Sequence, residues 1–96
     1  MITHIVFFKL KDRSPEAIQE TAQVLSNMEG QIPVLKSIEV GKDVIHSARS
    51  YDIALITKFD SLDDLAAYDI HPLHLTVKEH MKKVLDGTSV VVDFQS

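Results

Sequence analysis

The strand-like segments of this chain carry apolar side chains on both faces, and this feature constrains the fold more than any other. In residues 2–10 the even-numbered positions form one face rich in apolar side chains: Ile2, Val6, Phe8 and Leu10. The odd-numbered positions add Ile5 and Phe7 on the opposite face, because successive side chains of a strand point to opposite sides of a sheet. A chain of 96 residues is too short to cover both faces with its own helices. The sequence therefore predicts that a partner covers one of them.

Four segments rich in β-branched and aromatic residues predict strands. They lie at residues 2–10, 35–45, 51–59 and 88–94. Glycine is rare in regular strands, so we expect Gly41-Lys42-Asp43 to form a bulge or bend within the second strand. Alternation along these strands places Ala54, Ile56 and Val91 on the second apolar face, beside the odd-numbered residues of the first strand.

Apolar residues at helical spacing predict three helices between the strands. Ser14-Pro15 and Ser61 suit helix starts, because a serine side chain caps free N–H groups and proline fits the first turn. The second helix stops near His71, and Pro72 starts the third. The resulting order, β-α-β-β-α-α-β, is that of an α+β ferredoxin-like fold with a four-stranded antiparallel sheet, built as one domain over residues 1–96.

The helices of a ferredoxin-like subunit cover only one face of its sheet, so the second apolar face stays open. An exposed apolar patch of this kind marks a partner surface. Two copies packed sheet to sheet would bury the patch, and two-fold dimers are the commonest assembly of soluble proteins. The sequence therefore predicts a homodimer.

Composition and charge exclude several classes of protein. Fourteen Asp and Glu against ten Lys and Arg give a net charge of −4, without the basic stripe of a nucleic-acid binder. The absence of cysteine excludes disulfide bonds, thiolate nucleophiles and Cys-ligated metals. No apolar run reaches the ~20 residues of a membrane span, and no secretory leader pattern opens the sequence. We expect a cytoplasmic protein with no nucleic-acid or membrane partner.

Residues 68–74 are chemically the richest segment, because they hold Tyr68, His71 and His74. A tyrosine hydroxyl donates to a developing oxyanion, and histidine accepts a proton near neutral pH. Pro72 fixes the backbone between them. His4 lies on the strand face assigned to the helices, so its ring can point toward the same space. This pattern is typical of acid–base chemistry.

Structural alternatives stand beside each of these interpretations. His71, directly before a proline, suits a helix cap. Tyr68 can be a packing residue whose hydroxyl is satisfied within the fold. His74 can lie on the flank of its helix, and His4 can be a hydrogen-bonded core histidine. Each of the four residues therefore has a catalytic or binding interpretation and a structural one.

Other catalytic signatures are weak or absent. His71 and His74, three residues apart, can ligate one metal ion together with His4 or His80. The chain has no H-E-x-x-H segment and no paired-carboxylate spacing. It also lacks the G-x-S-x-G nucleophile elbow and a Gly-rich phosphate loop. A histidine metal site therefore remains an alternative to acid–base chemistry, whereas serine-nucleophile and phosphate-loop chemistry do not.

Three stretches of the sequence resemble the stress-responsive A/B-barrel (Dabb) family. They are His4–Asp12, Ile32–Lys36 with Gly41–Asp43, and Phe59–Ser61 leading into Tyr68–His74. The Tyr-x-x-His-Pro-x-His segment is the most specific of them, and the resemblance covers nearly the full length. It implies a ferredoxin-like subunit whose homodimer closes two sheets into an α/β barrel. That assembly agrees with the homodimer expected from the strand faces.

Function within the family is divided, and the resemblance implies more than one role. Many members are bacterial proteins without a known role, some plant members are stress-induced, and one plant member is a cofactor-free polyketide cyclase that works by aldol condensation. By resemblance to that cyclase, His74 removes a proton α to a carbonyl and Tyr68 holds the oxygen as charge develops. His4 matches a histidine that lines its pocket, and we assign both His4 and His71 to substrate binding.

The match to the plant cyclase is incomplete in the pocket. A second histidine and a tyrosine of its pocket fall at Ile53 and Leu25 here, so the resemblance does not carry over its substrate.

The family resemblance implies no organic cofactor. Plant members bind a magnesium ion through backbone carbonyls of an Ile-Pro-x-Leu/Met loop, and the matching positions are Glu29, Ile32 and Leu35.

Three hypotheses for function follow. The first is a Dabb-type protein with a pocket for a small carbonyl or aromatic ligand, acting as a cofactor-independent cyclase or isomerase through Tyr68 and His74. The second is a non-catalytic stress-response or ligand-binding dimer. The third is a relative of the dimeric-barrel monooxygenases, some of which degrade haem. The haem-degrading type relies on a tryptophan, and this chain has none, which excludes that branch.

Overall fold

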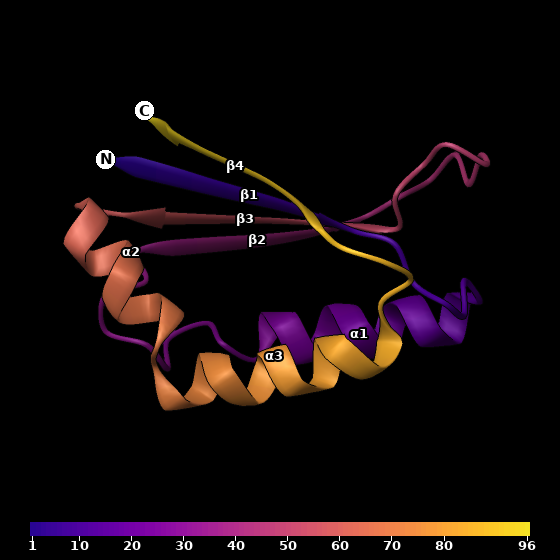
Figure 1. Ribbon diagram of the computed structural model, residues 1–96, viewed down its shortest axis with the longest axis horizontal. Helices are drawn as coiled ribbons and strands as arrows, with labels where there is room; N and C mark the ends of the chain where they lie inside the picture. Colours follow the sequence, from indigo (N-terminus) through magenta and orange to yellow (C-terminus); the bar gives the residue numbers. More distant parts are fainter.

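The computed structural model describes residues 1–96 and has one four-stranded antiparallel sheet with three helices against one of its faces (Figure 1). The strands are β1 (Ile2–Phe8), β2 (Ser37–Lys42), β3 (Ile53–Phe59) and β4 (Val90–Gln95). The helices are α1 (Pro15–Ser26), α2 (Leu62–Asp69) and α3 (Pro72–Val84). The order along the chain, β-α-β-β-α-α-β, confirms the α+β ferredoxin-like fold expected from the sequence.

The sheet has the strand order β2-β3-β1-β4, and every neighbouring pair is antiparallel. β1 therefore lies inside the sheet, paired with β3 on one side and with β4 on the other. In this register Val6 of β1 lies opposite Leu55 and Val91, and Ile5 lies opposite Ile56 and Val92. The two apolar faces of β1 are thus extended sideways by apolar residues of both neighbours.

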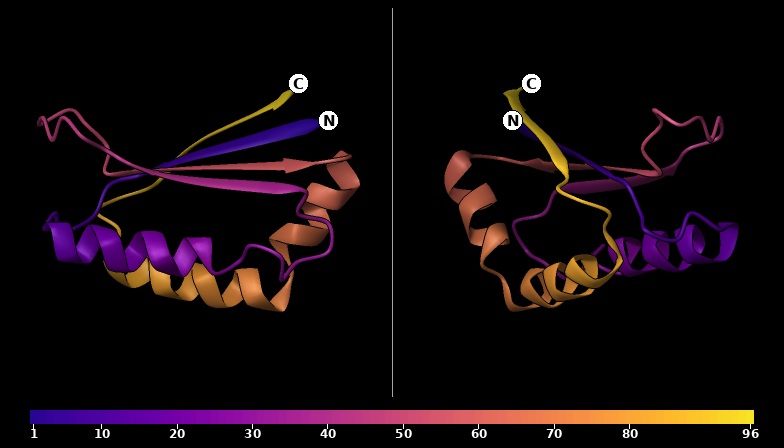
Figure 2. Two further views of the ribbon diagram at one scale, coloured as in Figure 1. Left: turned by 180° about the vertical axis from the view of Figure 1, so that it is seen from behind. Right: turned by 45° about the vertical axis from the view of Figure 1, so that its right-hand side comes forward.

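The first and last residues of the chain lie side by side at one end of the sheet, where β1 begins and β4 ends (Figures 1 and 2). The Ser96 amide donates a hydrogen bond to the Met1 carbonyl at 2.8 Å. The Thr3 hydroxyl donates to the Ser96 hydroxyl oxygen, also at 2.8 Å. Antiparallel pairing of the first and last strands therefore joins the two ends directly.

All three helices begin with a capping side chain, as the sequence predicts. The Ser14 hydroxyl oxygen accepts from the Ala17 amide at 3.2 Å, and that of Ser61 accepts from the Asp64 amide at 3.1 Å. At the start of α3, Nδ1 of His71 accepts from the amide of Leu73, again at 3.1 Å. These bonds satisfy N–H groups that have no partner inside the helix.

The hydrophobic core lies between the helices and one face of the sheet. α1 lies against β2 and β3, whereas α3 lies beside α1 and α2; Figure 2 shows α1 and α3 next to each other beneath the sheet. The fifteen buried apolar residues come from the helices, two of the strands (β1 and β3) and the adjoining loops: Ile2, Val6, Phe8, Leu10, Ile18, Ala22, Leu25, Met28, Ile32, Ile53, Leu55, Phe59, Tyr68, Val77 and Met81. α1 thus lies against the β2–β3 half of the sheet, and side chains of α3 face β1 and β4 across a cavity.

The opposite face of the sheet, called here the outer face, has no helix over it. Its apolar members are Ile5, Phe7, Ala54, Ile56, Val90, Val92 and Phe94. The prediction that Val91 belongs to this face is wrong, because Val91 pairs with Val6 and faces the helices. Val90, Val92 and Phe94 take its place, and all three are exposed. The outer face is therefore more apolar than the sequence analysis expected.

The second strand is shorter and more regular than predicted. β2 ends at Lys42, and Gly41 pairs in register with Ala54, so no bulge forms there. Val44 and Ile45 lie beyond the strand, in the loop of residues 43–52 that connects β2 to β3. Asp43 ends the ladder by using its carboxylate to accept from the amide of His46, which has a φ of 60°. This turn leads the chain away from the sheet.

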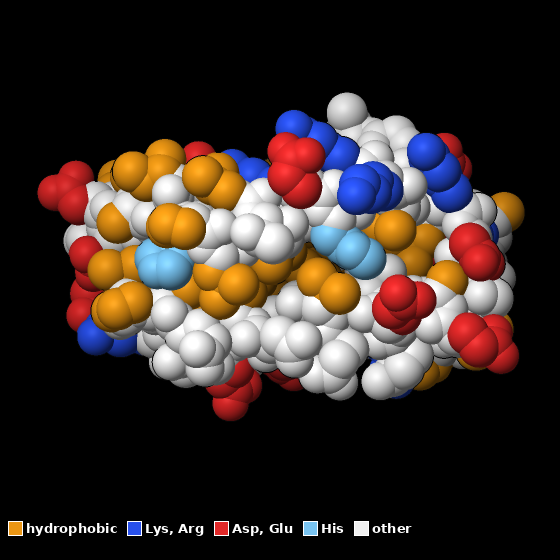
Figure 3. Space-filling model, turned by 90° about the horizontal axis from the view of Figure 1, so that it is seen from below, with side chains coloured by type: hydrophobic (Ala, Val, Ile, Leu, Met, Phe, Trp, Pro, Cys, Tyr) orange, Lys and Arg blue, Asp and Glu red, His pale blue; other side chains and the backbone are white.

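The helical side of the molecule presents both hydrophobic and charged side chains. Seen from that side, hydrophobic side chains gather toward one end and along the middle, whereas charged side chains lie around the margins (Figure 3). No helix combines the length and the hydropathy that crossing a bilayer requires.

Candidate functional site

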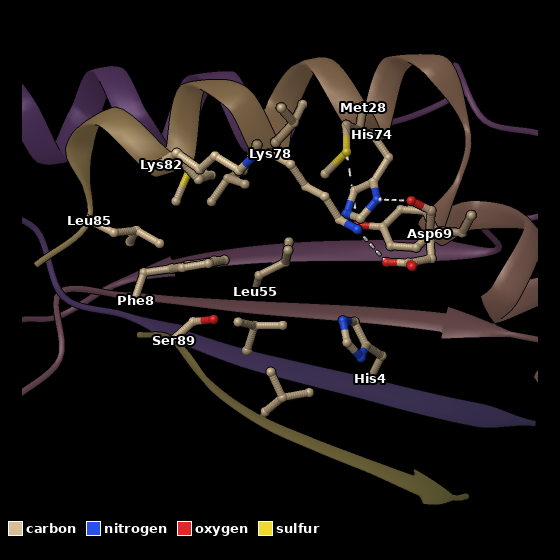
Figure 4. Close-up of a pocket in the computed structure, with 16 residues that line it drawn as sticks. His4, Phe8, Met28, Leu55, Asp69, His74, Lys78, Lys82, Leu85 and Ser89 are labelled. Atoms are coloured by element: carbon tan, nitrogen blue, oxygen red, sulfur yellow. Dashed lines mark hydrogen bonds and ion pairs between the residues drawn. The ribbon is translucent and has the colours of Figure 1, made fainter. Parts of the chain in front are cut away.

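A cavity of about 320 Å³ lies between α3 and the inner face of the sheet. Most of the residues that line it are hydrophobic, and the whole set is His4, Val6, Phe8, Leu25, Met28, Leu55, Tyr68, Asp69, His74, Val77, Lys78, Met81, Lys82, Leu85, Ser89 and Val91. Figure 4 shows His4 and Asp69 at one end of the cavity and Phe8 and Leu85 at the other. The site thus has one end rich in polar groups and a body that is mostly apolar.

His74 sits in the first turn of α3 and faces the cavity. Its Nδ1 lies 3.1 Å from the backbone carbonyl oxygen of Asp69. A carbonyl can only accept, so Nδ1 carries the proton and donates, which leaves Nε2 with a free lone pair. Burial lowers the pKa of His74, and the nearby Lys78 ammonium lowers it further, against the opposing effects of the carbonyl and the Asp69 carboxylate. His74 is therefore a neutral base at neutral pH.

Tyr68 comes from α2 and is almost wholly buried, with 1% of its surface exposed. Its ring centroid lies 4.1 Å from that of His74 and 4.9 Å from that of Phe59. Its hydroxyl donates to the sulfur of Met28 at 3.9 Å, and a thioether is a weak acceptor. Burial raises the pKa of Tyr68 well above its ordinary value, and the neighbouring Asp69 charge adds to this. The hydroxyl therefore remains a donor whose present partner is easily exchanged.

Asp69 and Lys78 form an ion pair at the rim of the cavity, with the Lys78 ammonium 2.7 Å from a carboxylate oxygen. The hydrogen bond from Lys78 holds the pKa of Asp69 below its ordinary value. The same Asp69 supplies the backbone carbonyl that orients His74. Lys78 thus acts on His74 twice, through the position of Asp69 and through its own charge.

His4 approaches the cavity from β1, on the sheet side, across from His74 and Lys78 (Figure 4). Its Nδ1 bonds to the carboxylate of Asp93, which lies directly opposite on β4. Its ring centroid is 6.4 Å from that of Tyr68. The structure therefore brings Tyr68, His74 and His4 to one cavity, and it gives His4 a fixed orientation through the neighbouring strand.

His71, the fourth predicted site residue, lies elsewhere. It caps α3 through Nδ1 and is not among the residues that line the cavity. The histidine metal site has no counterpart either, because no three His, Cys, Asp or Glu side chains lie close enough together to hold an ion. His71 thus has the structural role that the sequence offered as its alternative.

The residues matched to a magnesium loop, Glu29, Ile32 and Leu35, lie in the segment between α1 and β2. Glu29 and Leu35 line a hollow of about 400 Å³ beside β2, and Ile32 is not part of its lining. The Ile32 carbonyl accepts a turn hydrogen bond from the Leu35 amide at 3.1 Å. That the backbone carbonyls of these three residues bind magnesium stays a prediction from the family resemblance.

Comparison with known proteins identifies the family. A family model described as the stress responsive A/B barrel domain matches residues 2–96. The chain belongs to the stress-responsive A/B barrel (Dabb) domain family. The Dabb chain is 27% identical over 95 residues to a stress-response A/B barrel domain-containing protein of Arabidopsis thaliana, and the match covers 95% of the chain and 35% of that relative. It thus spans about a third of the length of the plant protein.

Solved structures similar to the Dabb chain have the same fold. A dimeric ferredoxin-like protein of unknown function from Thermobifida fusca matches with a TM-score of 0.83 and 31% identity, over 97% of this chain and 88% of that one. A dimeric protein of unknown function and ferredoxin-like fold from Bacteroides fragilis matches with a TM-score of 0.81 and 29% identity, over 99% and 95%. Both proteins are described as dimeric, and both have the ferredoxin-like fold found here.

Sequence reasoning missed two polar residues of the Dabb cavity, Asp69 and Lys78. Lys78 lies four residues after His74, so helical spacing places both on one face of α3. That spacing is a signal which could have found Lys78. Asp69 is nine residues from Lys78 and on another helix, and only the turn between α2 and α3 brings the two together.

Proposed function

We propose that this Dabb protein is a cofactor-independent enzyme that moves a proton next to the carbonyl of a small, mostly apolar substrate, as a cyclase or isomerase does. The observation that carries the proposal is the protonation geometry of His74 and Tyr68 at one end of the cavity. His74 presents a free Nε2, since its other nitrogen is tied to the Asp69 carbonyl. Tyr68 presents a hydroxyl that burial keeps protonated.

The first step is removal of a proton from the carbon α to the substrate carbonyl. The Nε2 lone pair of His74 takes the proton, and the electrons of the broken C–H bond move into the enolate. The negative charge grows on the carbonyl oxygen, where the Tyr68 hydroxyl donates in place of its bond to the Met28 sulfur. Return of the proton from His74 to another carbon gives an isomer. Alternatively, the enolate carbon attacks a second carbonyl and closes a ring, and the alkoxide formed from that carbonyl takes the proton back from His74.

The remaining lining supports this chemistry in two ways. The apolar body of the cavity, which includes Phe8, Leu55 and Val77, excludes water and favours a hydrocarbon or aromatic substrate. His4, fixed by Asp93, faces the same space from the sheet and is positioned to contact a second substrate oxygen. A volume of about 320 Å³ equals roughly ten water molecules at liquid density, which suits a small molecule.

Solvent deuterium exchange tests this proposal without knowledge of the natural substrate. The probe is 4-phenyl-2-butanone in D₂O at neutral pH, and the readout is loss of its α-proton signals in NMR spectra. We expect His74→Gln to lower the protein-catalysed rate by about 10²–10⁴-fold and Tyr68→Phe by about 10²–10³-fold.

The chain offers matched controls, because it has an exposed histidine and an exposed tyrosine outside the cavity. His46 and Tyr51 are both exposed, and neither lines the cavity. His46→Gln and Tyr51→Phe should exchange the probe at the wild-type rate. A wild-type rate equal to that of His74→Gln would contradict the enzymatic proposal.

A ligand-binding role without catalysis is the second candidate, and the mostly apolar lining of the cavity favours it. Binding of 4-phenyl-2-butanone, measured by chemical-shift perturbation, separates the two. If the wild type and His74→Gln bind the ketone equally and neither exchanges its protons, the cavity serves binding alone.

We also propose that the chain forms a homodimer through the outer face. Apolar residues lie there without a helix over them, among them exposed Phe7, Val92 and Phe94. The dimeric state of the similar proteins from Thermobifida fusca and Bacteroides fragilis supports this assembly. Light scattering at micromolar concentration should give twice the chain mass of 10.8 kDa, and a monomer mass would contradict the proposal.

A further inference from the structure

The loop of residues 43–52 between β2 and β3, called here the arm, projects from the sheet on the side away from the helices (Figures 1 and 2). All three views agree that it rises toward the side of the outer face. It contains Val44 and Ile45, which are 82% and 73% exposed. No other large apolar side chains of the chain are as exposed as these two. Connecting two strands does not require two exposed apolar side chains in the loop.

The arm is held in place by long side chains from outside it. Arg13 donates from one guanidinium nitrogen to the carbonyls of Ser47 at 3.2 Å and Ser50 at 3.1 Å. The Lys9 ammonium donates to the Ala48 carbonyl at 2.9 Å. Within the arm, the Ser47 and Ser50 hydroxyls lie 2.7 Å apart. Such anchoring fixes the backbone while the two apolar side chains stay in water, so the conformation presents them outward.

The apolar surface of the arm continues into the outer face. At the base of the arm the ring of Tyr51 lies 6.3 Å from that of Phe7, a member of the outer face. Beside them is a hollow of about 360 Å³, lined by Phe7, Tyr51 and Ala54 together with residues 41–43. The partner surface of the sheet therefore extends past its edge and onto the arm.

From this continuity we infer that the arm is a clasp for a second copy of the chain, in which Val44 and Ile45 of each protomer pack against the partner's outer face. The inference rests on the homodimer proposed above. A two-fold dimer repeats every contact, so two arms would bury four such side chains. Their burial holds the dimer together, and it removes from water the two most exposed large apolar residues of each protomer.

Sedimentation equilibrium on the double variant Val44→Asp with Ile45→Asp tests the clasp. The matched control is Leu62→Asp with Ile70→Asp, a pair that is 66% and 71% exposed and lies at α2, on the helix side of the sheet. We expect the arm variant to raise the dimer dissociation constant by about 100-fold or more, and the control to leave it unchanged. Circular dichroism checks that both variants fold.

A second measurement reads the contact in the unmodified chain. In a dimer mixed from ¹³C-labelled and unlabelled protomers, isotope-filtered NOEs should join the Val44 and Ile45 methyl groups to protons of the partner. A wild-type dimer whose dissociation constant the arm variant does not change, and which shows no such NOEs, overturns the clasp and leaves the arm free for a different partner. A wild-type monomer overturns the proposed homodimer and the clasp together.

Discussion

Two carboxylates of this protein, Asp52 and Asp69, each pair with one cation, but they do so in opposite environments. Asp52 is completely buried and accepts from Arg13 Nε at 2.8 Å and from the Leu10 amide at 2.8 Å. Asp69 is exposed at the rim of the cavity and accepts from Lys78 at 2.7 Å. The pair distances are nearly equal, so distance does not separate the two pairs.

Burial separates them. A buried charge has lost its hydration, and removing its partner leaves that loss uncompensated. The Asp52 pair therefore stabilises the fold, because it connects the end of β1 with the start of β3 and with the residues that anchor the arm. An exposed pair contributes little to stability, so the Asp69 pair is free to serve chemistry at His74. Substitutions at the two pairs test this division.

Asp52→Ala should lower the free energy of unfolding by about 3–5 kcal/mol, since it leaves the Arg13 guanidinium and the buried Leu10 amide without their acceptor. Urea denaturation at fixed protein concentration measures the change. Asp60→Ala is the control, because Asp60 is exposed and its only cation, Lys36, lies 3.6 Å away. The control should change stability by less than about 0.5 kcal/mol. Equal effects of the two substitutions would refute the division by burial.

Lys78→Met should change the free energy of unfolding by less than about 1 kcal/mol, because its pair with Asp69 is solvent-exposed. It should nevertheless raise the pKa of His74, since the ammonium that disfavours a charged ring is removed and the carboxylate of Asp69 is left free. NMR titration of the His74 ring measures this. Lys82→Met, one turn further along α3, is the control and should leave the pKa of His74 unchanged.

Stability should fall on mild acidification because of His74. The folded state holds the pKa of His74 below its ordinary value of 6.5. At pH values between the folded-state pKa and 6.5, the unfolded chain therefore binds more protons than the folded chain. The free energy of unfolding therefore decreases as the pH drops below about 6.5, until the folded-state pKa is passed. Chemical denaturation at pH values above the pKa range of the carboxylates measures this effect. The free energy of unfolding should fall with decreasing pH in the wild type and fall less steeply in His74→Gln. An unchanged slope would contradict it.

Tyr68→Phe should have the smallest effect on stability, less than about 0.5 kcal/mol, because the hydroxyl gives up only one weak bond to the Met28 sulfur. The ring, which provides the packing against Phe59 and His74, is retained. Thermal denaturation compared with Tyr51→Phe measures the difference. A loss of several kcal/mol would show that the hydroxyl serves the fold and not the cavity.

Local signals in the sequence were enough to predict the order of the elements and the helix starts. Ser14, Ser61 and His71 act through residues two or three positions away, so the pattern contains both partners of each bond. The inner face of β1 was likewise predictable, since the even-numbered positions of residues 2–10 carry more large apolar side chains than the odd-numbered ones. Tyr68, His74 and His4 were expected to share one space, and they line one cavity.

Errors arose where the pattern was ambiguous. Val90, Val91 and Val92 are identical and adjacent, so alternation cannot say which of them faces the helices; only the pairing of Val91 with Val6 decides it. Val44 and Ile45 have the β-branched side chains of a strand, which extended the predicted β2 into the arm. The Asp69–Lys78 pair depends on the angle between two helices, and no local rule specifies that angle.

The pairing of Ser96 with Met1 has a consequence for how the fold can be rearranged. Because the ends meet at a hydrogen bond of 2.8 Å, a peptide of a few residues would span them with a small loss of loop-closure entropy. The chain would then be a closed ring, and it could be opened at a surface loop to give a circular permutant with every strand pairing intact. Because its two ends are adjacent, the whole domain can also be inserted into a loop of a host protein without separating the two ends of that loop.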